Sequence, residues 1–393
     1  MKVKLSDLYD IGSSKRVFQS EWRKSGVPFY RAREIAKLSI DGYVNNELFI
    51  DEDLYLEYID KYGKPEAGDV MVTGVGTLGV CYVVKPEDRF YFKDGNILWF
   101  KQKAKDRILP EYLVKAFDSK DVKEFIYKNS SGTTVGTFTI QTAKKMEILL
   151  PSIEDQRNII QKITKIESVI KQRRQELQLL DNLIKARFVE MFGDVTTGNY
   201  KYKTCKLGDV ANIGSSHRVF TTEFVEKGIP FYRGTEIGEL ANGIKPTNPY
   251  YIAEEHYNRL INDGSKPQIG DLLMPSICNK GQVWMIDTEE PFYYKDGRVL
   301  CVSADRRIFN TKYLEYFMRV KTLLEYSKLG SGSTFAEFKI FLLKDIDVLI
   351  PPIELQNQFA DFVHQVDKSK FAVQKGLEEA QKLFDSLMQK YFS

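Results

Sequence analysis

Cysteine and histidine are scarce in this sequence, and their placement argues against metal chemistry. The four cysteines form no Cys-x-x-Cys pair, and 393 residues include only three histidines. A structural zinc site needs clustered Cys or His ligands, so we expect no metal site. Unpaired cysteines are typical of a reducing compartment, and we expect reduced thiols in a cytoplasmic protein.

Long apolar runs and a strong charge of one sign are also missing. No run approaches the roughly 20 apolar residues of a membrane span, and the N-terminal MKVKLSDLYD does not resemble a signal peptide. Hydrophobic residues make up 43% of the chain and charged residues 28%, an ordinary globular balance. The net charge of +3 permits nucleic-acid binding through local patches but does not argue for it.

Recognisable catalytic motifs are absent as well. GVGTLG at 74–79 resembles a dinucleotide loop, but strand-like VCYVV follows where that site needs a helix. We therefore expect a glycine-rich hairpin loop. NPYY at 248–251 lacks the second proline of an adenine methyltransferase loop and does not recur, so we interpret it as a turn. No nuclease carboxylate cluster or Ser/His/Asp arrangement is recognisable, and the chain is predicted to be non-catalytic.

What the sequence does contain is an internal repeat over its whole length. IGSSKRVF at 11–18 returns as IGSSHRVF at 213–220, and 18 of the 34 positions over 5–38 are identical at an offset of 202. Further on, LLPSIEDQ at 149–156 returns as LIPPIELQ at 349–356. Each copy is long enough to have its own core. Two copies of a module favour a target with two equivalent halves.

Each copy has a β-rich part followed by a heptad helix. Short strand-like runs punctuated by Pro and Gly fill the first part. The helix should begin after the cap Ser152 and stop at Gly193. Its apolar residues follow a 4-3-4-3 spacing that Arg173 interrupts once, and Lys370 interrupts the second copy in the same way. The predicted segments are 1–151, 152–193, 194–351 and 352–393. The predicted seam residues are Ile159, Ile163, Ile166, Ile170, Leu177, Leu180, Ile184, Phe359, Val363, Val366, Val373, Leu377, Phe384 and Leu387.

We expect the two helices to pair with each other as an antiparallel coiled coil. The predicted fold class is α+β, with two β-rich target-recognition domains separated by the paired helices and related by a pseudo-two-fold axis. A helix of about 37 residues spans roughly 55 Å and would hold the two β-rich domains a fixed distance apart, as a two-fold DNA-binding protein requires. The plain alternative is two independent amphipathic helices, each folded on its own domain.

Polar, basic and aromatic residues kept in both copies are the candidates for DNA contact, together with residues of two loops that differ, 74–79 and 276–281. Ser hydroxyls suit phosphate oxygens, and Arg suits phosphates or guanine edges. The alternative is that these motifs are domain scaffold, which we favour for Phe18, Pro28 and Phe29. The candidates of the first copy are Ser13, Ser14, Lys15, Arg16, Tyr30, Arg31, Arg33, Thr77, Lys93, Thr133 and Thr134. Those of the second copy are Ser215, Ser216, His217, Arg218, Tyr232, Arg233, Asn279, Lys280, Lys295, Ser333 and Thr334.

This architecture closely resembles the specificity subunit of type I restriction-modification systems, over nearly the full chain. The most specific elements are the SGTT and SGST stretches that lead through P-x-I-E-x-Q into each long helix. The resemblance implies that each β-rich domain reads one half of a split DNA sequence while the helices set the unread spacer. One departure is the high identity of the two domains, which are usually divergent in that family.

The resemblance also implies partners and their cofactors. Such subunits are non-catalytic and recruit two methyltransferase subunits, which bring S-adenosylmethionine, and further subunits can translocate and cut DNA with ATP and Mg²⁺. No cofactor is expected in this chain. Two other classes stay open: a protein-binding adaptor that uses the coiled coil as its interface, and a self-contained DNA methyltransferase or nuclease.

Overall fold

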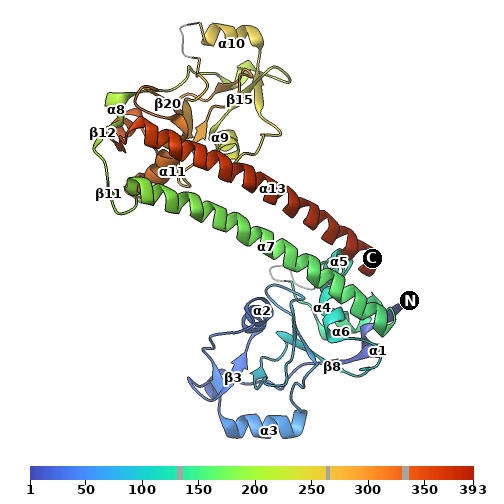
Figure 1. The fold of residues 1–393 in the computed structure, drawn as a ribbon. Helices are drawn as coiled ribbons and strands as arrows, with labels where there is room; N and C mark the ends of the chain where they lie inside the picture. Colours follow the sequence, from blue (N-terminus) through green and yellow to red (C-terminus); the bar gives the residue numbers. More distant parts are fainter. Residues whose placement is uncertain (131–135, 263–265, 330–335) are drawn as a thin grey trace. The chain divides into compact units, whose positions relative to one another are not determined.

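The chain folds into two compact units in a computed structural model that describes residues 1–130, 136–262, 266–329 and 336–393. Unit 1 comprises Met1–Gln175 and Gln374–Ser393, and unit 2 comprises Glu176–Val373. The two long helices are α7 (Ile153–Phe192) and α13 (Ile353–Phe392) (Figure 1). Each unit therefore combines a β-rich segment with one end of each long helix.

The β-rich segment of unit 1 holds a four-stranded antiparallel sheet in the order β2-β8-β5-β6, a three-stranded sheet in the order β4-β3-β7, and the pair β1-β9. In the three-stranded sheet, β3 runs parallel to β7. The elements are β1 (Lys2–Lys4), α1 (Leu5–Leu8), β2 (Tyr9–Gly12), η1 (Gln19–Glu21), β3 (Val27–Tyr30), α2 (Ala32–Asp41), β4 (Phe49–Ile50), α3 (Glu52–Tyr62), β5 (Val70–Thr73), β6 (Cys81–Val83), β7 (Tyr91–Phe92), β8 (Ile97–Gln102), α4 (Pro110–Asp118), α5 (Lys120–Lys128), α6 (Ile140–Lys145) and β9 (Glu147–Leu149).

Unit 2 repeats this order with three changes: a short hairpin β10-β11 after α7, an added strand β14, and one helix, α11, in place of α4 and α5. Its sheets have the orders β13-β20-β17-β18, β14-β16-β15-β19 and β12-β21. The elements are β10 (Gly193–Asp194), β11 (Asn199–Tyr200), β12 (Thr204–Lys206), α8 (Leu207–Val210), β13 (Ala211–Gly214), η2 (Thr221–Glu223), β14 (Phe224–Val225), β15 (Ile229–Tyr232), α9 (Gly234–Ala241), β16 (Tyr250–Ile252), α10 (Glu254–Leu260), β17 (Leu272–Pro275), β18 (Trp284–Met285), β19 (Tyr293–Tyr294), β20 (Val299–Ala304), α11 (Thr311–Tyr326), α12 (Ile340–Lys344) and β21 (Asp347–Leu349).

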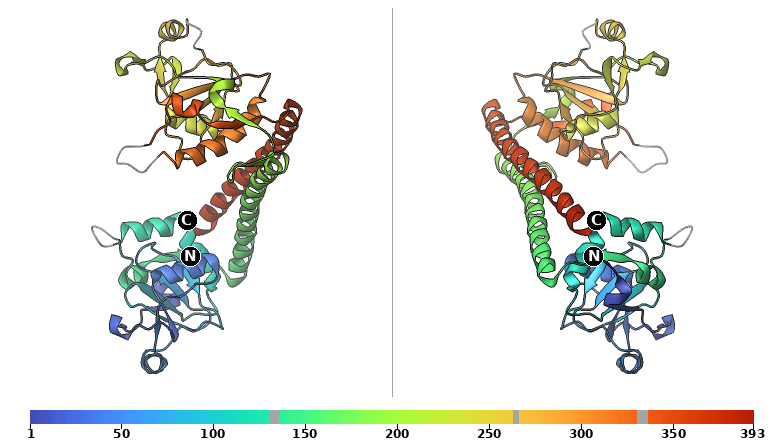
Figure 2. Two further views of the ribbon diagram at one scale, coloured as in Figure 1. Left: turned by 90° about the vertical axis from the view of Figure 1, so that its left-hand side faces the viewer. Right: turned by 90° about the vertical axis from the view of Figure 1, so that its right-hand side faces the viewer.

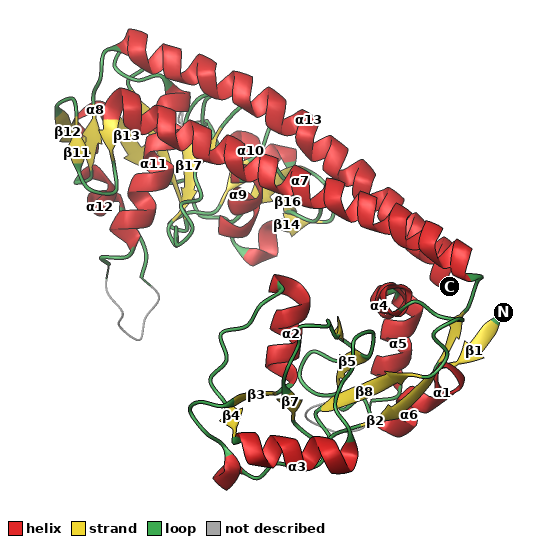
Figure 3. Ribbon diagram, turned by 60° about the horizontal axis from the view of Figure 1, so that its bottom comes forward, coloured by secondary structure: helices red, strands yellow, loops and turns green. Residues whose placement is uncertain are grey.

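The four-stranded sheet of unit 1 is buried on both faces. Val70 and Val72 share a hydrophobic cluster with Phe117 of α4, whereas the intervening Met71 shares another with Ile35 of α2. This period-two alternation sends successive side chains of β5 to opposite faces. A third cluster joins Tyr55 of α3 to Phe29 of β3 and Tyr91 of β7, and Figure 3 shows α3 beside these strands. The four-stranded sheet is therefore packed on both faces, and it gives rigid support to the loops that connect its strands.

Two local predictions have different outcomes. GVGTLG at 74–79 connects β5 to β6, whose residues Val72 and Cys81 pair antiparallel, so the expected hairpin loop is confirmed. The interpretation of NPYY as a turn is wrong for its tyrosines. Tyr250 and Tyr251 begin β16 and pair with Phe231 and Pro230, since their β-prone side chains extend the sheet instead of reversing the chain.

The bounds of α7 agree with its predicted cap and stop. Ser152 Oγ accepts a hydrogen bond from the Asp155 backbone N–H at 3.1 Å, which satisfies one free N–H of the first turn. At the other end Gly193 has a φ of +97°, and a Cβ there would lie 2.2 Å from the Asn199 carbonyl oxygen. Only glycine fits this position, and the helix ends there after 40 residues.

The long helices pair antiparallel, as predicted. In unit 1, Ile159 near the start of α7 shares a hydrophobic cluster with Phe392 at the end of α13. In unit 2, Phe188 near the end of α7 lies 5.3 Å from Phe359 near the start of α13, ring centre to ring centre. Both views of Figure 2 show the helices side by side. Every predicted seam residue is buried or half-buried, and neither helix is apolar enough along its described length to span a membrane.

The two basic interruptions of the seam are accommodated in different ways. In unit 1 the Arg173 guanidinium faces Gly376 of α13, where an added Cβ would lie 3.6 Å from Arg173 Nε. In unit 2 the Lys370 ammonium forms an ion pair with Asp181 at 2.6 Å. Each charge therefore reaches the edge of the seam, where long basic side chains keep their charged group hydrated.

Candidate nucleic-acid interface

The repeated Gly-Ser-Ser loop is tied to the Lys-Asp-Gly turn by its own hydroxyl groups. In unit 1, Ser13 Oγ donates to the Ile97 carbonyl oxygen at 2.9 Å and accepts from the Gly95 N–H at 3.1 Å. Ser14 Oγ donates to the Phe92 carbonyl oxygen at 2.6 Å. These bonds join the two segments into what we call the loop cluster of unit 1, residues 13–18 and 93–95.

Unit 2 builds its loop cluster, residues 215–220 and 295–297, with the same bonds. Ser215 Oγ donates to the Val299 carbonyl oxygen at 2.9 Å and accepts from the Gly297 N–H at 2.8 Å. Ser216 Oγ donates to the Tyr294 carbonyl oxygen at 2.6 Å. The serine hydroxyl protons are thus used inside each unit, which explains why these residues recur. Their contact with DNA stays a prediction.

The basic side chains of the loop clusters are more exposed than the serines. The Arg16 side chain is 67% exposed and pairs with Asp94 at 3.1 Å, whereas Arg218 lies over the Phe220 ring at 5.1 Å. The backbone N–H groups of Lys15 and His217 donate to the hydroxyls of the buried Tyr91 and Tyr293, which anchors the main chain of each loop, and the Lys15 and His217 residues are exposed. The exposed cations Lys15, Arg16 and Arg218 can reach a phosphate or a base edge, because the surface contacts that they would give up contribute little to the unfolding free energy.

Lys93 and Lys295 occupy the turns of the two loop clusters. The Lys93 N–H donates to the Tyr30 carbonyl oxygen at 2.8 Å, and the Lys295 N–H donates to Tyr232 at 2.9 Å. Both tyrosine rings are half-buried, and Tyr30 stacks on Phe90 at 4.8 Å. The tyrosines therefore hold the backbone of the turns in place, while the lysine side chains stay available to bind a ligand.

Arg31 and Arg233 have a structural role at the start of α2 and α9. The Arg31 guanidinium donates to both carboxylate oxygens of the buried Glu34, at 3.1 and 2.8 Å. Burial acts to raise the pKa of Glu34, but hydrogen bonds from Arg31 and Arg33 outweigh it and hold the pKa below its ordinary value. Arg233 and Glu236 repeat the pair. DNA contact by either arginine stays a prediction.

The remaining candidates lie where the two units differ. Arg33 pairs with Glu34 and Glu47 on the exposed side of α2, and its counterpart in unit 2 is a threonine. Exposed loop residues between paired strands account for three others: Thr77, Asn279 and Lys280. Four lie outside the described residues: Thr133, Thr134, Ser333 and Thr334.

Sequence reasoning missed a basic segment beside the loop cluster of unit 2. A cavity of about 390 Å³ is lined by Ser215 and Gly297 together with Lys339 and Lys344 at the two ends of α12. Both lysines flank the apolar run IFLL at 340–343, and four residues separate this segment from the Ser-Gly-Ser-Thr stretch at 331–334 that was singled out. The two flanking lysines were the available signal, and they lie beside a loop cluster that itself contains Arg218 and Lys295.

The interpretation of Phe18 as scaffold is wrong, whereas that of Phe29 holds. Phe29 is fully buried in the core, but Phe18 is 60% exposed. The two residues differ in position: Phe29 lies in strand β3 on its buried face, whereas Phe18 is the cap residue that precedes η1. Its counterpart Phe220 is 55% exposed.

A buried glutamine joins each β-rich segment to its long helix and explains the P-x-I-E-x-Q motif. Gln156 Nε2 donates to the carbonyl oxygens of Arg107 and Pro151 at 2.8 and 3.0 Å, and its Oε1 accepts from the Leu109 N–H at 2.9 Å. Gln356 makes the equivalent three bonds in unit 2. The helix is thereby fixed to the segment that carries the loop cluster.

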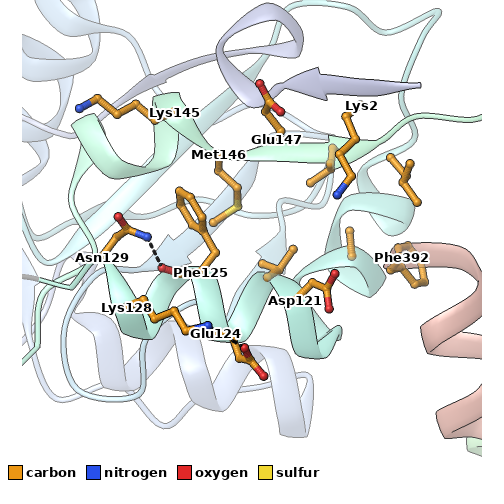
Figure 4. Close-up of a pocket in the computed structure, with 14 residues that line it drawn as sticks. Lys2, Asp121, Glu124, Phe125, Lys128, Asn129, Lys145, Met146, Glu147 and Phe392 are labelled. Atoms are coloured by element: carbon orange, nitrogen blue, oxygen red, sulfur yellow. Dashed lines mark hydrogen bonds and ion pairs between the residues drawn. The ribbon is translucent and has the colours of Figure 1, made fainter.

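The cavity drawn in Figure 4 has no arrangement typical of an active site. It encloses about 510 Å³ in unit 1, and its lining mixes Lys2, Lys128 and Lys145 with Asp121 and Glu147. Cations and carboxylates alternate around it, which favours neither an anionic nor a cationic ligand. Across the residues with a described placement, no group of three His, Cys, Asp or Glu side chains could hold a metal ion.

Comparison with known proteins identifies a family with this architecture. The family model described as the type I restriction modification DNA specificity domain matches twice, at residues 1–179 and 199–381. A putative type I restriction enzyme specificity subunit of Haemophilus influenzae is 29% identical over 42% of this chain and 40% of its own length. The putative MjaX specificity subunit of Methanocaldococcus jannaschii is 22% identical over 98% of this chain and 90% of its own length.

Solved structures of low sequence identity have the same fold. The S subunit of a type I restriction-modification system from M. genitalium covers 100% of this chain with 96% of its own, at a TM-score of 0.56 and 15% identity. A chain from a structural study of complex assembly in the type I system covers 100% of this chain with 97% of its own, at a TM-score of 0.61 and 18% identity. Two copies of the family domain, each with the loop cluster and the glutamine-anchored helix, show that the chain belongs to the type I restriction-modification DNA specificity family.

Proposed function

We propose that this chain is the non-catalytic DNA-specificity subunit of a type I restriction-modification complex, in which each β-rich segment reads one half of a bipartite target. The observation that carries the proposal is the duplicated loop cluster. Both copies hold a loop with two basic side chains against a Lys-Asp-Gly turn through the same serine bonds. Cations and loop residues on a rigid sheet are suited to contact phosphates and base edges.

The helix pair is proposed to set the unread spacer between the half-sites. A helix of 40 residues is about 60 Å long at 1.5 Å per residue. Gln156 and Gln356 fix each helix to its β-rich segment, so helix length would translate into the distance between the segments. The buried seam and the absence of any break in either described helix support this role.

The partners we propose are two methyltransferase subunits that dock on the helices and bring S-adenosylmethionine. Nuclease and translocase subunits that use ATP and Mg²⁺ would be further partners. The chain itself is proposed to supply sequence recognition only, since its sequence contains no recognisable methyltransferase or nuclease motif.

Reconstitution tests this division of labour. The chain is co-expressed with the methyltransferase subunit encoded beside it, purified, and assayed for transfer of labelled methyl groups to genomic DNA. We expect methylation at one bipartite sequence by the complex and none by either component alone. Methylation by the purified chain alone, or methylation by the complex without sequence preference, would contradict the proposal.

A further inference from the structure

Two exposed phenylalanines occupy equivalent positions in the loop clusters. Phe18 is 60% exposed and Phe220 is 55% exposed. Phe341 and Phe371 are exposed as well, but their counterparts in the first copy are Gln141 and Lys171. Exposed phenylalanine is therefore kept in both copies at the loop cluster and not at these two other sites.

Burial cannot explain why this phenylalanine is repeated. Identical residues elsewhere in the motif have contacts inside the unit: Phe29 and Phe231 are in the core. A phenyl ring forms no conventional hydrogen bond, and its exposure to water costs free energy that contact with another apolar surface recovers. The repeated ring is thus available for a contact outside the unit.

The backbone beneath each ring is held in the same conformation. The Phe18 N–H donates to the Glu21 carboxylate at 2.6 Å, and the Phe220 N–H donates to Glu223 at 2.7 Å. Between them the sequence differs, with Gln19-Ser20 in one copy and Thr221-Thr222 in the other. Both short helices η1 and η2 are therefore capped alike, and each ring is presented from ordered backbone, which lowers the entropy lost on contact.

The chemistry around the rings points to a nucleic-acid base. Arg16 precedes Phe18 by two residues, and the Arg218 guanidinium lies 5.1 Å from the Phe220 ring centre. Cations beside an apolar ring match the DNA surface, where charged phosphates flank apolar base faces and thymine methyl groups. A purely apolar protein partner would not need these cations.

We propose that Phe18 and Phe220 each make an apolar contact with a base of the half-site that their loop cluster reads. This inference rests on the proposed function and adds a residue that determines specificity. The neighbouring Arg16 and Arg218 would neutralise phosphates on either side. Apolar contact to a base and ionic contact to a phosphate respond differently to salt, because only the second releases counterions.

The test measures binding of the complex with methyltransferase subunits to its cognate DNA and to a scrambled duplex, over a range of salt concentrations. We expect Phe18→Ala and Phe220→Ala each to weaken cognate binding roughly tenfold and to leave the slope of log K against log salt unchanged. Phe18→Leu should keep part of the affinity. Tyr127→Ala, which removes an 81% exposed aromatic side chain from α5, outside both the loop clusters and the long helices, is the matched control and should bind as the wild type does.

Four outcomes overturn the inference. The first is that Phe18→Ala and Phe220→Ala prefer the cognate over the scrambled duplex as strongly as the wild type does. The second is a loss of affinity with a shallower salt slope, which would indicate a phosphate contact. Poor assembly with methyltransferase subunits at normal DNA affinity would assign the rings to a protein partner. A wild-type complex that binds both duplexes equally would overturn the proposed function as well.

Discussion

Gln156 shows how much one buried side chain contributes to joining a β-rich segment to its helix. Gln156→Leu would leave the Arg107 and Pro151 carbonyl oxygens and the Leu109 N–H without this partner. Each unsatisfied buried group costs about 1–3 kcal/mol, so we expect a loss of about 3 kcal/mol or more in the unfolding free energy of unit 1. Urea unfolding measures it. Gln161→Leu, at an exposed position of the same helix, should be nearly neutral, and an equal effect of both substitutions would contradict the role of Gln156.

The buried thiol of Cys278 predicts a loss of stability at alkaline pH. Burial raises its pKa to about 11, whereas a thiol in the unfolded chain ionises near 8.5. Because the unfolded state releases its proton first, the unfolding free energy of unit 2 should fall as the pH rises from about 8.5 to about 11. Urea titrations across this range measure the slope. Cys278→Ala should reduce the slope, leaving the part due to Cys205, Cys301 and the buried tyrosines of unit 2, whose pKa values are also raised, and an unaltered slope would argue against the assignment.

The contacts and the burial of single residues were the least predictable features from sequence. The repeat singles out Ser13, but the carbonyl oxygen that binds its hydroxyl belongs to Ile97, 84 positions away. A pattern of residue types does not contain such a long-range bond. The same holds for Phe18, since only the path of the folded chain decides whether a phenylalanine is in the core or in water.

At the scale of the elements, Gly376 weakens the helix that it belongs to. Glycine in a helix interior costs about 1 kcal/mol relative to alanine, and the added Cβ would meet Arg173 Nε at an ordinary contact distance of 3.6 Å. Gly376→Ala should therefore raise the unfolding free energy of unit 1 by about 0.5–1 kcal/mol. Gly281→Ala is the opposite case, because its Cβ would lie 2.4 Å from the Arg319 carbonyl oxygen. A lower unfolding free energy for Gly376→Ala would contradict this expectation, which urea unfolding of both variants measures.

The helix pair gives a prediction about DNA spacing. Seven residues inserted near the middle of both α7 and α13 preserve the heptad pattern and add about 10 Å to each helix. The methylated site should then gain about three base pairs of spacer at 3.4 Å each. The same insertion in one helix alone should disrupt pairing and abolish activity. An active double insertion with the original spacer would refute the proposal that helix length sets the spacer.

The helices were the elements most predictable from sequence, because a heptad pattern is local and long. Ser152 and Gly193 set the bounds of α7 as expected. The sheets were less accessible: β3 pairs in parallel with β7, about 60 residues further on, and nothing in either short strand indicates its partner. The replacement of α4 and α5 by a single α11 was likewise not predicted.

For the whole molecule, the repeat predicts the symmetry of the target. If two similar loop clusters read DNA as copies related by a two-fold axis, the half-sites should be related as inverted repeats. Deviations should come from the loops 74–79 and 276–281 and from Arg33 against Thr235. Long-read mapping of methylated adenines in the source genome provides the measurement. Two unrelated half-sites would contradict this expectation.

The division of the molecule into two halves was predictable from the repeat, but the composition of each half was not. Sequence order suggests four successive segments, whereas unit 1 takes Gln374–Ser393 from the far end of the chain. The apolar residues of α13 have the same spacing throughout, so the pattern does not show which of them pack on which β-rich segment. Antiparallel pairing decides this, and it is a property of two helices together.

Because unit 1 includes the end of α13, its folding cannot be completed until the last residues of the chain have been synthesised. The core of unit 1 includes Met388 and Phe392, and the Phe392 ring lies tilted against the Tyr112 ring, with 5.1 Å between the ring centres. At about 5–20 residues per second, a ribosome needs roughly 10–40 s after finishing residue 175 before those side chains exist. During that interval Ile159 and Ile163 have no partner helix from their own chain. The nascent polypeptide must therefore be kept from aggregating, and a chaperone or an early partner subunit would fill that role.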